Sequence, residues 1–161
     1  MKVLFTLLIF YIFGNVVWRT ILRKGAYPSS VNWYLKWTHA LILVFLLTYA
    51  LGAFGELFWL IRFRPNIRDD LFVGIARIIT IITGLALPFI CDRMVKRQRQ
   101  ALRWYFTVWP ICFLTANYVR FATLGDKYPT WLIEFVAAMS FCLLLATVIF
   151  YMIDSVQRAL F

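Results

Sequence analysis

The chain alternates long apolar runs with short polar stretches. A segment of about 20 apolar residues is long enough to cross the hydrocarbon core of a bilayer. Inside lipid every backbone amide must bond within its own segment, so such runs form helices. The pattern therefore predicts an all-α bundle of about five transmembrane helices in a single domain, residues 1–161. The predicted segments are Val3–Leu22, Trp37–Ile61, Leu71–Ile90, Trp104–Leu124 and Thr130–Ile153.

The first segment allows two topologies. Met1 and Lys2 followed by an apolar stretch resemble the start of a secretory signal, but residues 13–16 offer no small-x-small cleavage site. We expect an uncleaved signal-anchor helix. If the segment lies on the membrane surface instead, four helices cross and both termini lie inside.

The short loops predict the orientation, because Lys and Arg accumulate in cytoplasmic loops. With the N-terminus outside and the C-terminus inside, ten of the 17 Lys and Arg residues lie on the cytoplasmic side, against five outside. The cytoplasmic set is Arg19, Arg23, Lys24, Lys36, Arg93, Lys96, Arg97, Arg99, Arg103 and Arg158. The external set is Lys2, Arg62, Arg64, Arg68 and Lys127.

Composition confirms that lipid, not a soluble core, must take up the apolar surface. The chain is 63% hydrophobic, with a mean hydropathy of +0.80, whereas soluble domains are roughly 45–50% apolar. The net charge of +10 does not indicate nucleic acid, since the basic residues lie in short loops and no aromatic–basic binding motif is present. We expect contact with anionic lipid headgroups. The residues predicted to make it are Arg93, Lys96, Arg97, Arg99 and Arg103.

Four charged residues lie inside the apolar runs: Glu56, Arg77, Arg120 and Glu134. A charge in the hydrocarbon is costly, so it usually faces protein or a water-filled cavity. Each lies four to six residues from the nearest predicted outer helix end, which is roughly 6–9 Å at 1.5 Å per residue. The four therefore share one layer beneath the outer surface.

Small and weakly polar residues continue the helix face of each charge, as at packed membrane-helix interfaces. The faces carry Gly52 and Tyr49 beside Glu56, Thr80 beside Arg77, Asn117 and Ala116 beside Arg120, and Ala138 and Cys142 beside Glu134. We therefore expect all four charges to point inward, supported by Thr80 and Asn117. The predicted pairs are Glu56–Arg77 and Glu134–Arg120, or an exchange of partners within the cluster. Such pairs can fix helix register, line a polar cavity that accepts a charged group, or form a proton or ion path.

Other candidate chemistry is sparse. His39 is the single histidine, which excludes a bis-histidine haem, and a His–Met site with Met94 is disfavoured. We expect His39 near the headgroups at the start of the second helix. Cys112 and Cys142 lie at equal depth, so a disulfide between them is possible. We expect them instead to be reduced cysteines that pack between helices. No catalytic motif, metal-ligand spacing or cofactor motif is present, so we expect neither an enzyme, a metal nor a cofactor.

In length, helix number, basic cytoplasmic loops and lack of catalytic residues, the chain resembles pore-colicin immunity proteins and prophage superinfection-exclusion proteins. The resemblance implies a non-enzymatic protective protein of the bacterial cytoplasmic (inner) membrane that acts on another membrane-inserted or translocating protein. Two alternatives stay open: an accessory subunit of a larger membrane complex, and a small carrier or lipid flippase that uses the charge layer. The partners expected are the anionic bilayer and a membrane protein or a second copy of the chain.

Overall fold

The structure is a computed structural model that describes residues 2–19, 31–63, 71–124 and 128–161. Within these ranges the chain forms helices and no strand, which confirms the predicted all-α class. The helices are α1 Lys2–Val17, α2 Trp33–Phe63, α3 Leu71–Val95, α4 Gln100–Leu124, α5 Thr130–Met152 and α6 Asp154–Leu160.

The helices differ from the predicted segments mainly at their ends. α2 begins at Trp33, before the expected Trp37, and α3 continues beyond Ile90 to Val95. The short α6 was not predicted, because only its buried Val156 and Leu160 mark an apolar face. Several sequence predictions lie outside the described residues: the segment end at Leu22 and the loop cations Arg23, Lys24, Arg64, Arg68 and Lys127.

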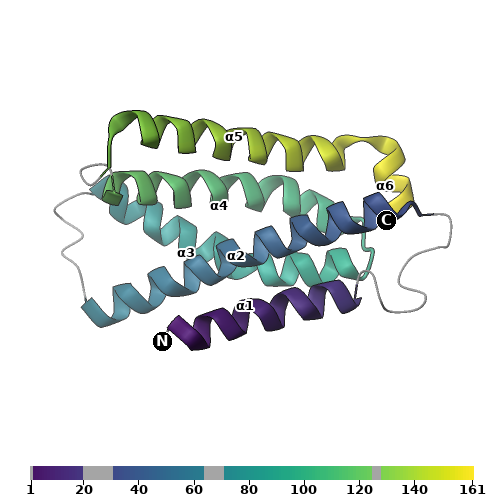
Figure 1. Ribbon diagram of the computed structural model, residues 1–161, viewed down its shortest axis with the longest axis horizontal. Coiled ribbons are helices and arrows are strands. Elements are labelled where there is room, and N and C mark those ends of the chain that lie inside the picture. The colour runs from purple at the N-terminus through teal and green to yellow at the C-terminus, as the bar shows by residue number, and fades with distance from the viewer. Residues whose placement is uncertain (1, 20–30, 64–70, 125–127) are drawn as a thin grey trace.

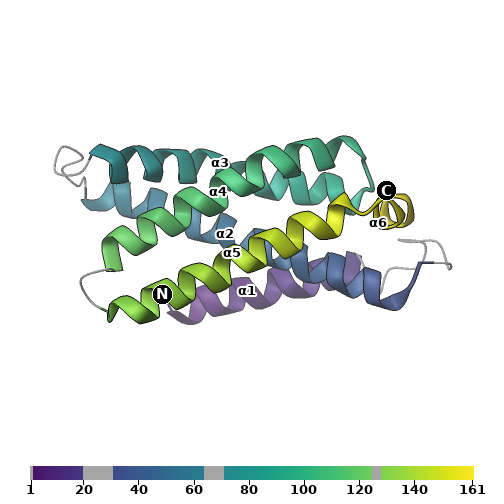
Figure 2. The same ribbon diagram turned by 90° about the horizontal axis from the view of Figure 1, so that it is seen from above.

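The long helices run back and forth along one axis. Figure 1 shows α5 and α1 at opposite edges of the molecule, with α2, α3 and α4 between them. α3 packs along both α2 and α4, while α1 contacts α2 and α5 contacts α4 and α6. We call the end at which α2 and α4 finish the distal end, and the opposite end, which carries α6 and the C-terminus, the α6 end (Figures 1 and 2).

The centre of the bundle depends on one close approach between α2 and α3. Gly84 of α3 lies so near Ala53 of α2 that a Cβ atom added to the glycine would overlap the Ala53 Cβ atom. Cys112 of α4 borders the same point. Small residues at helix crossings let backbones approach closely in membranes, where dispersion contacts rather than water exclusion hold helices together. Gly84 therefore fixes the spacing of the three central helices.

Within the described residues, three helices are long and apolar enough to cross a lipid bilayer: α2, α3 and α5. In the described residues α1 has 16 residues, and α4 has 25 but includes more polar side chains. A membrane crossing by the predicted first and fourth segments stays a prediction.

α5 packs against the bundle much less than α3 does. Only 11% of its most apolar stretch is buried, against 44% for α3. Its buried residues, Leu144, Thr147 and Tyr151, all lie in its second half, towards the α6 end. The first half of α5 therefore has no fully buried residue, and Glu134, Phe135 and Ala138 are among its exposed side chains.

Candidate functional site

Glu56 and Arg77 form the ion pair that the sequence predicted. Arg77 Nε lies 3.1 Å from Glu56 Oε2, and the side chains are 15% and 33% exposed, respectively. The two atoms do not meet hydrogen-bond geometry, so charge attraction holds this contact. The Arg77 guanidinium carbon also lies 4.2 Å from the centroid of the Trp59 ring. A cation over an aromatic face is favourable, so Trp59 and Glu56 together stabilise Arg77 in the bundle.

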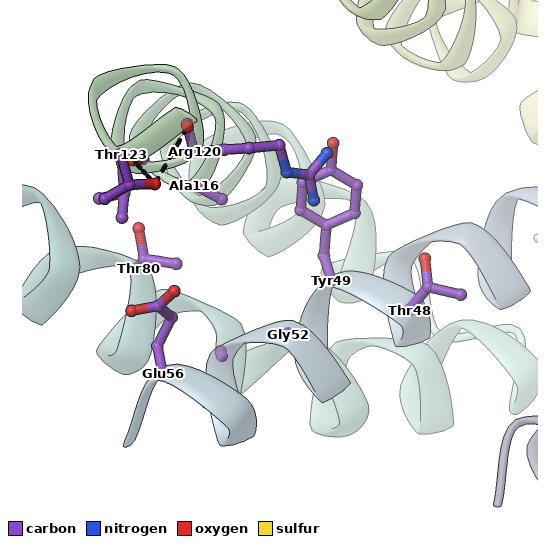
Figure 3. A pocket seen from close by; sticks show the side chains of 10 residues that line it. Thr48, Tyr49, Gly52, Glu56, Thr80, Ala116, Arg120 and Thr123 are labelled. Carbon is purple, nitrogen blue, oxygen red and sulfur yellow. Dashed lines mark hydrogen bonds between the residues drawn. The ribbon is translucent and has the colours of Figure 1, made fainter. Parts of the chain in front are cut away.

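A cavity of about 360 Å³ opens beside this pair, between the second halves of α2 and α4. Figure 3 shows Glu56 reaching into it from α2 and Arg120 from α4, with the Arg120 guanidinium beside the Tyr49 ring. Small residues on both helices leave the space open. The lining residues are Thr48, Tyr49, Gly52, Ala53, Glu56, Thr80, Ala116, Val119, Arg120 and Thr123.

Both predicted supporting residues belong to this region. Thr80 lines the cavity, and its hydroxyl lies 2.8 Å from the Ala76 carbonyl oxygen and 2.9 Å from the Thr115 hydroxyl. Asn117 lies behind the cavity wall, where its Nδ2 donates to the Tyr49 hydroxyl at 3.2 Å and to the Phe113 carbonyl at 2.8 Å. These bonds fix the Tyr49 ring, which forms one side of the cavity.

The charged residues in and beside the cavity, Glu56, Arg77 and Arg120, carry one more positive than negative charge. Glu56 is compensated by Arg77, and among the residues that the structure describes no carboxylate pairs with Arg120. Glu56 and Arg77 neutralise each other, which leaves the Arg120 charge without an acidic partner among the described residues. In surroundings of low dielectric constant an uncompensated charge attracts an opposite charge strongly. The cavity therefore suits an anionic group.

The prediction that Glu134 points inward is wrong. Glu134 is exposed on α5, and it forms no ion pair with Arg120 within the described part of the chain. Ala138 and Cys142, which continue its face, are exposed as well. The physical reason is that the first half of α5 buries no residue against the bundle. The structure brings Glu56, Arg77 and Arg120 together and leaves Glu134 apart.

A second polar group, which the sequence analysis missed, is buried at the α6 end. We expected His39 near the headgroups, but it is 1% exposed, and a hydrogen bond of 2.6 Å joins its Nδ1 to the Tyr151 hydroxyl. Nearby, Trp109 Nε1 donates to the Thr147 hydroxyl at 3.1 Å. α2 starts and α5 finishes at this end. Counting residues from the predicted helix ends, as for the four charges, puts His39 level with Tyr151.

The basic residues between α3 and α4 divide into bound and exposed groups. Lys96 Nζ lies 2.6 Å from Asp92 Oδ2, and Arg19 of the α1 end lies 3.5 Å from Asp92 Oδ1. Arg97 is half-buried and donates to the last carbonyls of α6, at 3.0 Å to Leu160 and 3.4 Å to Ala159. Arg93, Arg99 and Arg103 are exposed, as is Lys96, and none of the three arginines forms an ion pair with another described residue. Headgroup contact stays a prediction, best supported for these three.

The three cysteines are free thiols: Cys91 and Cys112 are buried and Cys142 is exposed. Within the described ranges no group of three or more His, Cys, Asp or Glu residues is placed to hold a metal ion. Comparisons with protein-family models, curated proteins and solved structures found no match.

Proposed function

We propose that the chain is a non-enzymatic integral protein of the bacterial cytoplasmic membrane that binds a charged group of another membrane-embedded molecule. In the proposed topology five helices cross with the N-terminus outside, which puts the distal end and its cavity in the outer half of the bilayer. The apolar α2, α3 and α5 and the basic residues near the α6 end support this orientation.

The observation that carries the proposal is Arg120 in the wall of a polar cavity, with no acidic partner among the described residues. An unpaired charge within a helical bundle costs a few kcal/mol on insertion scales. A purely structural layer would pair each charge, as Glu56 pairs with Arg77. Arg120 is instead left beside about 360 Å³ of open space. Such a site is suited to an anionic side chain or headgroup that enters from the side.

Among non-enzymatic membrane proteins of this kind, we propose the protective role suggested by the resemblance to immunity and superinfection-exclusion proteins. The bound molecule would be a membrane-inserted or translocating protein, as for superinfection-exclusion and immunity proteins. Expression of the chain alone should then lower sensitivity to a phage or bacteriocin, and Arg120→Gln should abolish that protection. Unchanged sensitivity with stoichiometric copurification of a larger complex would favour the accessory-subunit alternative.

One observation favours a second candidate, a small carrier or lipid flippase. Glu56 and Arg120 both line the cavity, so one ligand would meet a negative charge, shared with Arg77, and a positive charge. A zwitterionic headgroup has the matching charges. Lipid scrambling or solute flux in proteoliposomes, lost on Arg120→Gln, would support this candidate over the protein-binding one.

The proposed binding site can be tested by photo-crosslinking in native membranes. A photoreactive residue at Thr123, on the cavity wall, should form an adduct that Arg120→Gln reduces about tenfold, since a charge pair contributes on the order of 1.4 kcal/mol or more when desolvated. Thr107 is the matched control, because it is an exposed threonine of the same helix that does not line the cavity. Equal adducts at both positions, or an adduct unaffected by Arg120→Gln, would contradict the proposal.

A further inference from the structure

Arg120 and Glu134 carry opposite charges at the same height of the bundle, yet they do not pair within one copy. Arg120 lies four residues before the end of α4 at Leu124, and Glu134 lies four residues after the start of α5 at Thr130. Because the two helices are antiparallel neighbours, both side chains lie roughly 6 Å from the distal helix ends. Both residues are exposed, and no ion pair joins them in the described part of the chain.

We propose that each charge is paired by a second copy of the chain. The first half of α5 of one copy docks over the cavity of the other, and Glu134 of each copy meets Arg120 of the other. This inference rests on the proposed function, because it names the occupant of the same cavity.

A symmetric dimer requires that two residues in contact lie at the same depth in the membrane. In a two-fold dimer, if residue i contacts residue j of the partner, then j also contacts i. Two copies inserted the same way in a membrane can share only a two-fold axis along the membrane normal, which keeps every residue at its own depth. A charge can therefore meet only a charge at its own level. Arg120 and Glu134 satisfy this condition.

The two surfaces also match in shape and charge. The face of α5 that carries Glu134 continues in the exposed small residues Ala138 and Cys142. The facing wall offers Gly52 and Ala116 beside the surplus positive charge. Small residues on both sides allow close approach of helices in lipid. Docking would also remove two lone charges per copy from contact with the bilayer, where they are costly.

Disulfide trapping tests the arrangement in the full-length protein. Two chains with different tags are coexpressed in a Cys142→Ser background, one with Glu134→Cys and the other with Arg120→Cys. Mild oxidation should link them into a heterodimer. The symmetry leaves the reciprocal pair intact, since the first chain keeps Arg120 and the second keeps Glu134. The two remaining cysteines, Cys91 and Cys112, are buried and serve as a constant background.

A matched control separates this contact from random collision. Phe135 is exposed and adjacent to Glu134 but points about 100° away around the helix. Phe135→Cys should cross-link with Arg120→Cys at least about fivefold less than Glu134→Cys does. Equal cross-linking of both, or a disulfide that forms only when one chain carries both cysteines, would overturn the proposal. The latter result would show that α5 closes over its own cavity.

Charge reversal gives an independent measurement. Arg120→Glu and Glu134→Arg should each lower the dimer fraction in nanodiscs about tenfold, because like charges then face each other across the interface. The double variant should restore it. A dimer fraction unchanged by either single reversal would overturn the proposal, and so would its absence in the unmodified protein.

The photo-crosslinking at Thr123 distinguishes the failure of this inference from that of the proposed function. A self-adduct that Arg120→Gln removes supports both. An Arg120-dependent adduct with a different protein or with lipid overturns the second-copy inference alone. No Arg120-dependent adduct overturns both.

Discussion

Both ends of the bundle bury polar residues, but the distal end also leaves charged side chains open to a cavity. At the α6 end His39, Tyr151, Trp109 and Thr147 are all buried, and each is hydrogen-bonded to another helix. At the distal end Glu56 is a third exposed, and Arg120 lines an open cavity. α2 and α4 supply polar residues at both ends, whereas α5 adds Thr147 and Tyr151 at the α6 end and α3 adds Arg77 and Thr80 at the distal end.

The difference comes from where α5 packs. Its second half contributes Thr147 and Tyr151 to the buried group at the α6 end, whereas its first half has no fully buried residue. Polar bonds between helices are worth about 1 kcal/mol each in membranes, so the α6 end secures α5 to the bundle. α5 packs less closely against the bundle at the distal end. We infer that the α6 end stabilises the bundle and that the distal end recognises a partner, and four predictions test this difference.

The largest effect is expected from Trp109→Ala at the α6 end. Trp109 is completely buried, and its ring packs edge-on against Phe45, Tyr49 and Phe113, with centroids 5.1–5.4 Å away. Truncating a buried Trp costs about 3–5 kcal/mol, because a cavity is left and contacts are lost. Unfolding in detergent should show this loss. Trp104→Ala is the control, since Trp104 of the same helix is 56% exposed. Similar losses for both would contradict the closed packing described.

Gly84→Ala should have the next largest effect, at the crossing that joins the two ends. The added methyl group would overlap Ala53, and overpacking costs about 1–3 kcal/mol. Gly52→Ala is matched, because a Cβ there meets no atom within 4 Å. That variant should be neutral or up to about 1 kcal/mol more stable, from helix propensity alone. Thermal unfolding of both proteins checks the difference, and equal stability would rule out a fixed α2–α3 spacing.

Tyr151→Phe should reduce stability by a smaller amount. It removes the hydroxyl that bonds His39 Nδ1 at 2.6 Å, and an unsatisfied buried partner costs about 1–3 kcal/mol. Tyr118→Phe, at an exposed tyrosine of α4, should change nothing measurable. In a double-mutant cycle, His39→Phe and Tyr151→Phe should be non-additive, because they remove the same bond. Additive losses would mean that the bond contributes nothing.

Helix length and position predicted much of the fold and part of the site. Apolar runs identified the long helices, and counting residues from helix ends placed Glu56 level with Arg77. The same counting put Arg120 and Glu134 at one height, which the helix bounds support. Counting gives depth and face, but it does not say which helix a face meets. The small residues beside Glu134 suit packing against the same chain or another one, so the sequence left the orientation of α5 undetermined.

α6 and the buried His39 escaped prediction for related reasons. α6 is seven residues long, too short for a periodic signal. Its position depends on Arg97, whose side chain bonds the last carbonyls of α6 from the turn after α3. His39 was judged alone, as a polar ring near a helix end. Its environment is decided by Tyr151, which is 112 residues away in sequence. The sequence alone does not show that the two residues are in contact.

Glu56→Gln and Arg120→Gln should have the smallest effects on stability. The two variants should also differ from each other, because Glu56 has a partner in the described chain and Arg120 has no acidic one. Glu56→Gln removes the partner of Arg77, whose side chain is only 15% exposed. A partly buried pair at this exposure is worth about 1 kcal/mol, between the values for surface and buried pairs. Arg120→Gln removes a charge that has no acidic partner in the described chain, so stability should change by less than about 0.5 kcal/mol. It should nevertheless reduce cross-linking at Thr123 on the cavity wall about tenfold. If Arg120→Gln destabilised the protein more than Glu56→Gln did, Arg120 would be part of the structural framework. The distal end would then resemble the α6 end, and its role in recognition would lose its main support.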